Sequence, residues 1–268
     1  MKQLRVLHVW DQAGVACILA KQHRRQGHEV RVLKRAGYDP YGISQFYGEP
    51  LLDIDGKGFL KLVAKEAVNY DLIHVHSLYK LVPELRKKYP DIKIVIHYHG
   101  SDARDTTHDP LRAEAENKAD AILGSTDDLK AYVNSMICIP NPVDTEHFTP
   151  GAAESGAFTI RTTRGDSQWV LDYLKRNNID LSVKVVDRDA SPMQYSEIPA
   201  LLRRYGTYVD IKFIDGVLLQ AMSKTGLEAL ACGLTVLNHK LNYVKGLPRD
   251  HRPEVAAKSI MDIYHSVA

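Results

Sequence analysis

Residues 4–33 read LRVLHVWDQAGVACILAKQHRRQGHEVRVL, and this stretch decides the fold class. Its first seven residues are rich in β-branched and apolar types and stop at a turn around Gly14, which predicts a strand followed by a tight turn. An apolar face over residues 15–26 predicts a helix that ends at Gly27, and residues 29–33 return to a strand pattern. The stretch therefore predicts one strand–helix–strand unit.

The same alternation continues along the first half of the chain. We expect helices at 58–69, 81–89 and 111–119, and strands at 72–76, 93–98 and 121–123. Strands about 20–30 residues apart with helices between them are typical of a parallel, doubly wound α/β sheet with right-handed crossovers.

A second run of this pattern follows a segment rich in Pro, Gly and Ala around residue 150. We expect helices at 168–177, 198–205, 227–232 and 253–267, and strands at 158–160, 181–186, 209–214 and 234–237. The sequence thus predicts two Rossmann-like doubly wound domains, 1–150 and 151–268, facing a central cleft, with the final helix able to pack back on the first domain. In open parallel sheets the ligand lies beyond the carboxyl ends of the strands, so the loops there are where we look for a site.

Composition excludes several classes of protein. With 35 Lys and Arg against 33 Asp and Glu, the net charge of +2 gives no footprint for nucleic-acid binding. The three scattered cysteines fit reduced core thiols better than a disulfide framework or a zinc site. The chain starts directly with a strand pattern and has no apolar run of about 20 residues, which predicts a cytoplasmic protein. Basic runs at 23–25 and 86–88 leave peripheral contact with the cytoplasmic membrane face open, although such runs are usually solvated helix faces.

Two loops of the first half carry candidate residues. Gly14 would let the backbone approach a ligand, at the start of a helix whose free amides attract anions. After the strand 93–98, an imidazole at His99, an orienting carboxylate at Asp102 and an anion contact at Arg104 would share one strand end. The alternatives are a plain strand-to-helix turn and a polar loop with a solvated histidine.

Four histidines at strand ends also raise the question of a metal. They are His74, His76, His97 and His99. No cysteine or carboxylate stands at a metal-ligand spacing beside them, so we expect no metal site.

A candidate anion site occupies residues 223–233, SKTGLEALACG. Amides of Thr225 and Gly226 at a helix start would face a phosphate, and Lys224 would add charge. Thr225 and Glu228 also fit the S/T-x-x-E capping box, in which the glutamate caps its own helix. Both interpretations stay open at this point.

Several of these segments together resemble the retaining glycosyltransferases of the GT-B fold, in the large group-1 (GT4-like) family. The segments that carry the resemblance are GHEV at 27–30, DLIHVH at 71–76, HYHGSD at 97–102, ST at 125–126, NPVDTEHFTP at 141–150 and GLEALACG at 226–233. They span most of the chain in the family's order.

The resemblance implies an acceptor-side N-terminal domain and a C-terminal domain that binds a UDP- or GDP-sugar, without a metal or other cofactor. In the family's E-x7-E signature, Glu228 matches the second glutamate, which holds the ribose, and Gln220 stands where the first would face the sugar. The family's usual Gly-Arg and Lys phosphate pair after the first strand of the second domain is not clear in this chain. Arg161, Arg164 or Lys224 could supply the phosphate contacts instead.

In this interpretation His99 would touch the sugar and Gly14 would lie close to the diphosphate. The chain would then transfer the sugar to a hydroxyl of a small-molecule, glycan or lipid acceptor. Two other functions stay open. A catalytically silent nucleotide-sugar binding or regulatory subunit would explain Gln220 and a second domain short for the family, and a GT-B-type nucleotide-sugar epimerase would share the architecture.

Overall fold

The computed structural model describes residues 3–151, 155–161, 166–188 and 190–268. The chain forms two compact units: unit 1 is Met1–Pro142 with Pro253–Ala268, and unit 2 is Val143–Arg252. The first unit thus ends at Pro142 rather than at the expected residue 150. The backbone amide of Val143 donates to the carbonyl oxygen of His251 (2.9 Å), so the segments that enter and leave unit 2 are bonded to each other.

Unit 1 contains a seven-stranded parallel sheet in the order β3-β2-β1-β4-β5-β6-β7. The strands are β1 (Arg5–Val9), β2 (Glu29–Arg35), β3 (Leu51–Leu52), β4 (Leu72–His76), β5 (Lys93–Tyr98), β6 (Ala121–Gly124) and β7 (Ile137–Cys138). This confirms the doubly wound parallel sheet. The strand order reverses between β1 and β4, and ligands of such sheets bind outside the carboxyl ends at this switch point.

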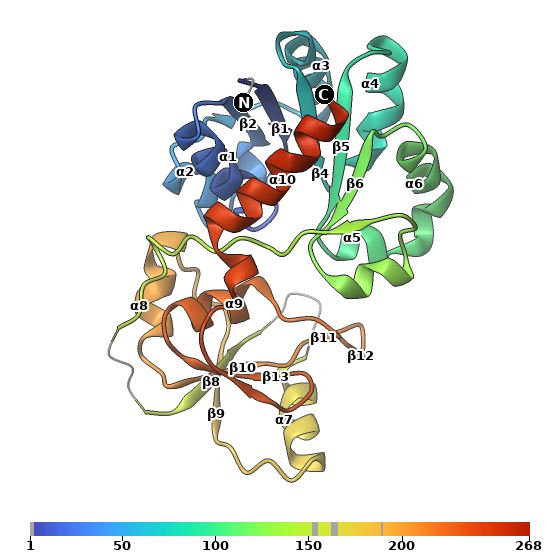
Figure 1. Cartoon of the computed structure of the whole chain (residues 1–268). Coiled ribbons are helices and arrows are strands. Elements are labelled where there is room, and N and C mark those ends of the chain that lie inside the picture. Colours follow the sequence, from blue (N-terminus) through green and yellow to red (C-terminus); the bar gives the residue numbers. More distant parts are fainter. Residues whose placement is uncertain (1–2, 152–154, 162–165, 189) are drawn as a thin grey trace. The chain divides into compact units, whose positions relative to one another are not determined.

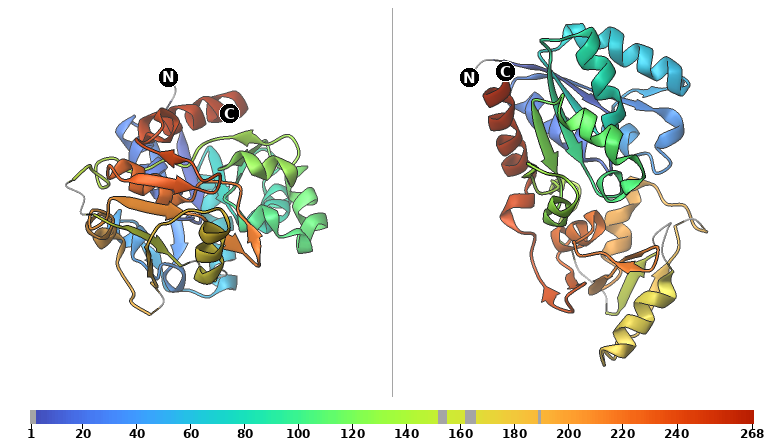
Figure 2. Two further views of the ribbon diagram at one scale, coloured as in Figure 1. Left: turned by 90° about the horizontal axis from the view of Figure 1, so that it is seen from below. Right: turned by 90° about the vertical axis from the view of Figure 1, so that its right-hand side faces the viewer.

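Helices cover both faces of the unit 1 sheet. They are α1 (Val15–Arg25), α2 (Ile43–Phe46), α3 (Gly56–Glu66), α4 (Val82–Lys88), α5 (Ser101–Arg104), α6 (Asp109–Glu116) and α10 (Pro253–Val267). Because side chains alternate along a strand, Val6 packs toward α1 and α10 while Leu7 packs toward α3 and α4. Figure 1 shows α1 and α10 on the same face, and Figure 2 shows α3 and α4 on the opposite one.

The terminal helix α10 belongs to unit 1 because its apolar stripe is buried there. Ala257, Ile260, Met261 and Tyr264 are at most 3% exposed and join the cluster formed by α1 and the sheet. Burying each of the larger side chains stabilises the unit by about 1.5–3 kcal/mol.

Unit 2 has a smaller Rossmann-like sheet in the order β14-β13-β10-β8-β9, parallel except for β14. Its strands are β8 (Ala157–Ile160), β9 (Val183–Val186), β10 (Thr207–Asp210), β13 (Thr235–Asn238) and β14 (Tyr243–Val244), and its helices are α7 (Ser167–Arg176), α8 (Ile198–Leu202) and α9 (Lys224–Ala231). Helix α7 packs on one face through Val170 and Leu174, and α9 packs against β10 and β13.

The strand expected at 209–214 is wrong, since it divides into two elements. Strand β10 ends at Asp210, and Phe213–Ile214 (β11) instead pairs with Val217–Leu218 (β12) as an antiparallel hairpin. The connecting residues Asp215 and Gly216 both have positive φ, 49° and 81°. Asp-Gly is a preferred sequence for such a two-residue turn, because glycine and, less readily, aspartate tolerate this backbone conformation.

Among the helices that the structure describes, none is long and apolar enough to span a membrane.

Candidate functional site

Five histidines gather at the carboxyl ends of three neighbouring strands of unit 1. They are His8 on β1, His74 and His76 on β4, His97 on β5, and His99 just beyond β5. The register places His8 beside His74 and His76 beside His97, so all five side chains share the face covered by α1 and α10. The first four are fully buried and His99 is half-buried.

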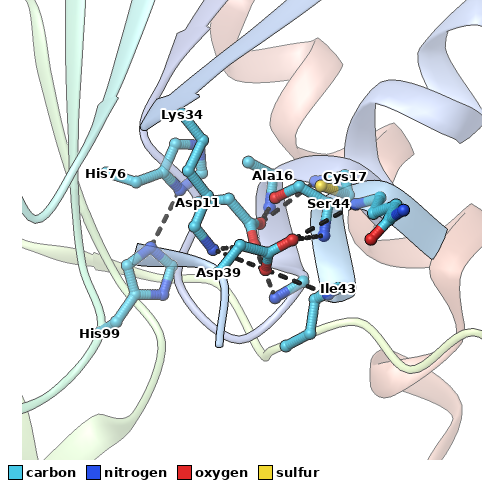
Figure 3. A network of polar contacts seen from close by, with 11 residues as sticks. Asp11, Ala16, Cys17, Lys34, Asp39, Ile43, Ser44, His76 and His99 are labelled. Atoms are coloured by element: carbon cyan, nitrogen blue, oxygen red, sulfur yellow. Dashed lines mark hydrogen bonds and ion pairs between the residues drawn. The ribbon is translucent and has the colours of Figure 1, made fainter. Parts of the chain in front are cut away.

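Hydrogen bonds link four of these rings in one chain. His8 Nδ1 lies 2.9 Å from His76 Nε2, and His76 Nδ1 lies 2.9 Å from His99 Nε2. Ser125 Oγ then lies 2.9 Å from His99 Nδ1 and 3.1 Å from His97 Nε2. Figure 3 shows the contact between His76 and His99.

Burial keeps these rings uncharged. It lowers the pKa of all five imidazoles below the usual histidine value, because a buried imidazolium loses its hydration. At the four fully buried histidines, repulsion from neighbouring imidazoles lowers the pKa further. At His99 the carboxylates of Asp102 and Asp11 and a hydrogen bond with Asn141 oppose the lowering of the pKa. The cluster therefore offers neutral imidazoles at neutral pH.

Asp102 does not orient the His99 imidazole as the sequence suggested. Its carboxylate accepts from the backbone amides of His99 (3.0 Å) and Gly100 (2.6 Å), and thereby fixes the turn after β5. The His99 ring is held instead by His76 and Ser125. Arg104, the expected anion contact, is paired with Asp128 at 2.7 Å.

The backbone amides at the start of α1, near Gly14, already donate to a carboxylate of the chain. Gly14 has φ 81°, and Asp11 accepts from the amides of Gly14 (3.0 Å) and Ala16 (2.8 Å). Lys34 Nζ lies 3.5 Å from Asp11 and 3.4 Å from Asp39 (Figure 3). A diphosphate at Gly14 would meet this carboxylate, so the structure does not support the anion contact expected there.

In unit 2 the candidate phosphate contacts follow β8. Arg161 is exposed and forms an ion pair with Asp187 at 2.6 Å. Arg164, the alternative candidate, lies outside the described residues.

Lys212 is a buried cation that the sequence reasoning did not single out. Its Nζ donates to the carbonyl oxygen of Ile160 (2.7 Å) and to the hydroxyl of Tyr208 (2.9 Å). Burial lowers the pKa of Lys212 to about 8, although the carboxylate of Asp210 acts in the opposite direction. The available signal was a lysine between two apolar residues at a strand end, in Ile211-Lys212-Phe213.

Ser223, not Thr225, caps helix α9. Ser223 Oγ accepts from the Gly226 amide (3.0 Å), and the Ser223 amide donates to Asp210 (2.7 Å). A Cβ on Gly226 would lie 2.4 Å from an Asp210 oxygen, so this carboxylate needs a glycine there. The Gly226 amide already donates to Ser223, so it is not free for a phosphate. Of the two amides proposed for the phosphate, this leaves the amide of Thr225, a half-buried residue in the first turn of α9.

The capping-box interpretation of Glu228 is wrong for the same reason. Glu228 lies one turn into α9 and accepts from Lys224 Nζ at 3.0 Å. The two side chains are only 7% and 11% exposed. Gln220, at the other end of the E-x7-E spacing, is exposed on the segment between β12 and α9. Lys224 and Glu228 are thus brought together by the structure, whereas Gln220 has no described contact with them.

About half of the chain, nearly all of it in unit 1, matches a known family. Residues 13–147 match the family model described as Glycosyltransferase Family 4. The chain belongs to glycosyltransferase family 4. It is a transferase of glycosyl groups, and the family predicted from the sequence is confirmed.

Several solved glycosyltransferases are similar to this chain at low sequence identity. An α-glucosyltransferase in complex with UDP and a 13-mer DNA containing a central A:G mismatch is 13% identical, over 87% of this chain and 79% of that one, with a TM-score of 0.51. The spinosyn forosaminyltransferase SpnP is 13% identical over 100% and 96% (TM-score 0.49), and MurG of Acinetobacter baumannii is 13% identical over 97% and 83% (TM-score 0.46). The similarity to the first concerns the fold alone, and the fold class expected from the sequence, with two Rossmann-like domains of the GT-B kind, is confirmed. A search of curated protein sequences returned no match.

Proposed function

We propose that this glycosyltransferase moves a sugar from a nucleoside-diphosphate donor, bound by unit 2, to an acceptor hydroxyl. The observation that carries the proposal is the Lys224–Glu228 pair at the start of α9, beside the carboxyl end of β10. Nucleotides of Rossmann-like domains bind at this edge of the sheet. Retention of the anomeric configuration and the absence of a metal at the diphosphate follow from the family resemblance.

The departing diphosphate is the charge that the enzyme must stabilise. Lys224 and Arg161 are cations at the carboxyl edge of the sheet, and each is held by a carboxylate in the free protein. A bound diphosphate would replace those carboxylates as the ion-pair partner of the two cations. The backbone amide of Thr225 would donate a further hydrogen bond to it. Preorganised donors of this kind stabilise the leaving group in the transition state.

Glu228 would then be free to accept hydrogen bonds from the ribose hydroxyls. Gln220 would contact the transferring sugar, because an amide bonds a hydroxyl although it carries no charge. On the acceptor side, His99 is a half-buried neutral imidazole whose ring is held at both nitrogens. We assign it the contact with the sugar or with the acceptor, which is a small molecule, a glycan or a lipid.

A catalytically silent nucleotide-sugar binding subunit is the second candidate. The observation that favours it is Gln220. This residue is exposed, and it places an uncharged amide where the family's E-x7-E signature has a glutamate that faces the sugar. Such a protein would bind the donor without turnover.

The test measures binding first and turnover second. UDP, GDP and other nucleoside diphosphates are titrated calorimetrically, with UDP first because a similar α-glucosyltransferase was solved with it. The sugar form of the tightest nucleotide is then incubated with and without acceptors, and the anomeric configuration of the product is read by NMR.

We expect product only when an acceptor hydroxyl is present, with retained configuration and no increase in rate on adding Mg²⁺ or Mn²⁺. Binding without product would identify the silent subunit, and conversion of the sugar without an acceptor would identify an epimerase. If no nucleoside diphosphate binds, the proposal is rejected.

A further inference from the structure

An apolar groove lies between α3 and α4, the two helices that cover the second face of the unit 1 sheet (Figure 1). This α3–α4 groove has a volume of about 490 Å³. Leu60 and Ala64, one turn apart on α3, form one wall, and Leu81 and Leu85 form the other. The hydroxyl of Tyr89 donates to the carbonyl oxygen of Ala64 (2.5 Å) and so ties the end of α4 to α3.

The groove continues toward the carboxyl edge of the sheet. A second part of about 440 Å³ adjoins the first, because the two have three lining residues in common: Leu60, Lys80 and Leu81. The second part ends at the loop after β5, where Ser101 and Asp102 line it. Asp102 accepts from the His99 amide, so the polar end of the groove lies at the turn that carries His99. Ligands of open parallel sheets bind at this edge.

The rim of the groove is basic. Lys80, Lys87 and Lys88 line its first part and are exposed, against Glu84 as the acidic residue there. The last two lysines belong to the basic run that the sequence showed at 86–88. An anionic group can therefore pair with several cations along the rim.

Helix α3 adds a second row of positive charge beside the groove. The exposed residues Lys57, Lys61 and Lys65 stand four positions apart, so they share one side of the helix, next to Leu60 and Ala64. Like charges one turn apart repel each other, and an anionic partner would relieve that repulsion.

The shape and lining of the groove select the class of occupant. Contiguous apolar surface that reaches solvent marks an interaction site, because its burial against an apolar partner is favourable. A glycan has hydroxyl groups on most sides and would leave the leucine walls without such a partner. An acyl chain with an anionic head matches both the elongated apolar walls and the lysines on the rim.

We propose that the α3–α4 groove binds the acyl chain of an anionic lipid, and that this lipid is the acceptor. The second clause rests on the proposed function; chain binding does not. The chain would lie between Leu60 and Leu85, its anionic group would pair with lysines of the rim, and its hydroxyl would reach the carboxyl edge of the sheet.

Chain binding is tested without a nucleotide. Lauroyl lysophosphatidic acid, which carries an acyl chain, a phosphate and a free hydroxyl, is titrated calorimetrically into the full chain below its critical micelle concentration. Glycerol phosphate has the same head without the chain, and monolaurin has the chain without the phosphate. We expect the lysolipid to bind once per chain, monolaurin to bind more weakly, and glycerol phosphate not to bind.

Leu60→Gln tests the apolar wall. Leu60 lines both parts of the groove and is 48% exposed, so the fold should tolerate the change, which circular dichroism checks. We expect lysolipid affinity to fall about 10-fold. Leu111→Gln is the matched control, because Leu111 on α6 is also 48% exposed and lines neither part of the groove.

Lys80→Gln tests the rim. We expect it to weaken the lysolipid about 3-fold and to leave monolaurin unchanged, since only the lysolipid carries a charge. Lys258→Gln, at an exposed lysine of α10, should bind both as the wild type does.

Turnover tests the assignment of the acceptor. The lysolipid should compete with whichever acceptor supports transfer, and Leu60→Gln should raise the KM of that acceptor without lowering kcat. Transfer that the lysolipid does not inhibit overturns the assignment. Failure of every nucleoside diphosphate to bind would reject the proposed donor but would not alter the measured binding of the chain.

The groove itself is rejected by two results. One is a folded wild type that does not bind the lysolipid, even if it floats with anionic phospholipid vesicles, since the face would then contact a bilayer without holding a chain. The other is equal lysolipid affinity in Leu60→Gln and Leu111→Gln, which would place the lipid elsewhere.

Discussion

Lys224 Nζ lies 3.0 Å from a carboxylate oxygen of Glu228, one helical turn away along α9. Both side chains are mostly buried, so water screens the pair only partly. In the free enzyme the carboxylate therefore neutralises the cation that we assign to the diphosphate. A bound donor can satisfy both groups separately, with its phosphates on the lysine and its ribose on the glutamate.

Glu228→Gln tests that exchange. The substitution keeps the shape of the side chain and removes its charge, so we expect nucleoside-diphosphate affinity to fall about 10- to 100-fold, which is about 1.5–3 kcal/mol. Calorimetric titration of the folded variant measures the loss, and Glu254→Gln, at an exposed glutamate of α10, is the control. Unchanged affinity in Glu228→Gln would remove this residue from the donor site.

Gly226→Ala tests the packing behind the α9 cap. An added Cβ would lie 2.4 Å from Asp210 Oδ2, and the oxygen is held by the Ser223 amide, so it cannot move freely. We expect a loss of about 1–3 kcal/mol in the free energy of unfolding. Gly37→Ala, where nothing lies within 4 Å of the added atom, should change stability by less than about 0.5 kcal/mol. Equal urea unfolding curves for the two variants would contradict this account.

The alternating sequence pattern was sufficient for most of the fold. Helix α10 has the predicted bounds, and the strands of unit 1 run in parallel as their spacing indicated. The pattern failed at 209–214, where apolar residues continue through the end of β10 into the hairpin. The Asp215-Gly216 turn is the sequence signal that marks the hairpin there.

The candidate site was harder to predict because contacts distant in sequence decide it. Ser223 and Thr225 both suit a helix cap, and Asp210, which bonds Ser223 from the end of β10, selects between them. The strand register brings the histidines together. The sequence shows only pairs of histidines two residues apart, whereas the pairing of β1 with β4 places His8 beside them.

His23 should make the protein sensitive to acid. It is fully buried on α1, and its Nε2–H donates to the carbonyl oxygen of Ala257 (3.0 Å). Burial lowers the pKa of His23 to about 4, with a smaller contribution from His28, while the bond to Ala257 opposes the shift. Since the unfolded chain titrates near the ordinary value of about 6.5, this stability is present above pH 6.5 and is lost as pH falls toward 4.

At pH 5 the loss attributable to His23 is about 2 kcal/mol. Urea unfolding at pH 7 and pH 5 measures it, with His23→Gln beside the wild type. The other buried imidazoles titrate in both proteins, so the difference between the two pH-dependent losses isolates His23. We expect the variant to lose less stability than the wild type, and equal losses would show that its burial does not control the acid response.

Asp11→Asn tests whether a carboxylate rather than a ligand completes the start of α1. Asparagine can still accept from the amides, but it no longer pairs with Lys34, whose side chain is 5% exposed and keeps only Asp39 as its described ion-pair partner. We expect a loss of about 2–3 kcal/mol in urea unfolding, and partial recovery in Asp11→Asn/Lys34→Met, which removes the buried cation as well. Asp91→Asn, at an exposed aspartate, is the control.

Phosphate should not stabilise the wild type through this helix start, because Asp11 already occupies it. If Asp11→Asn cost nothing and phosphate stabilised the wild type more than this variant, the helix start would be an anion site and the carboxylate a part of its recognition.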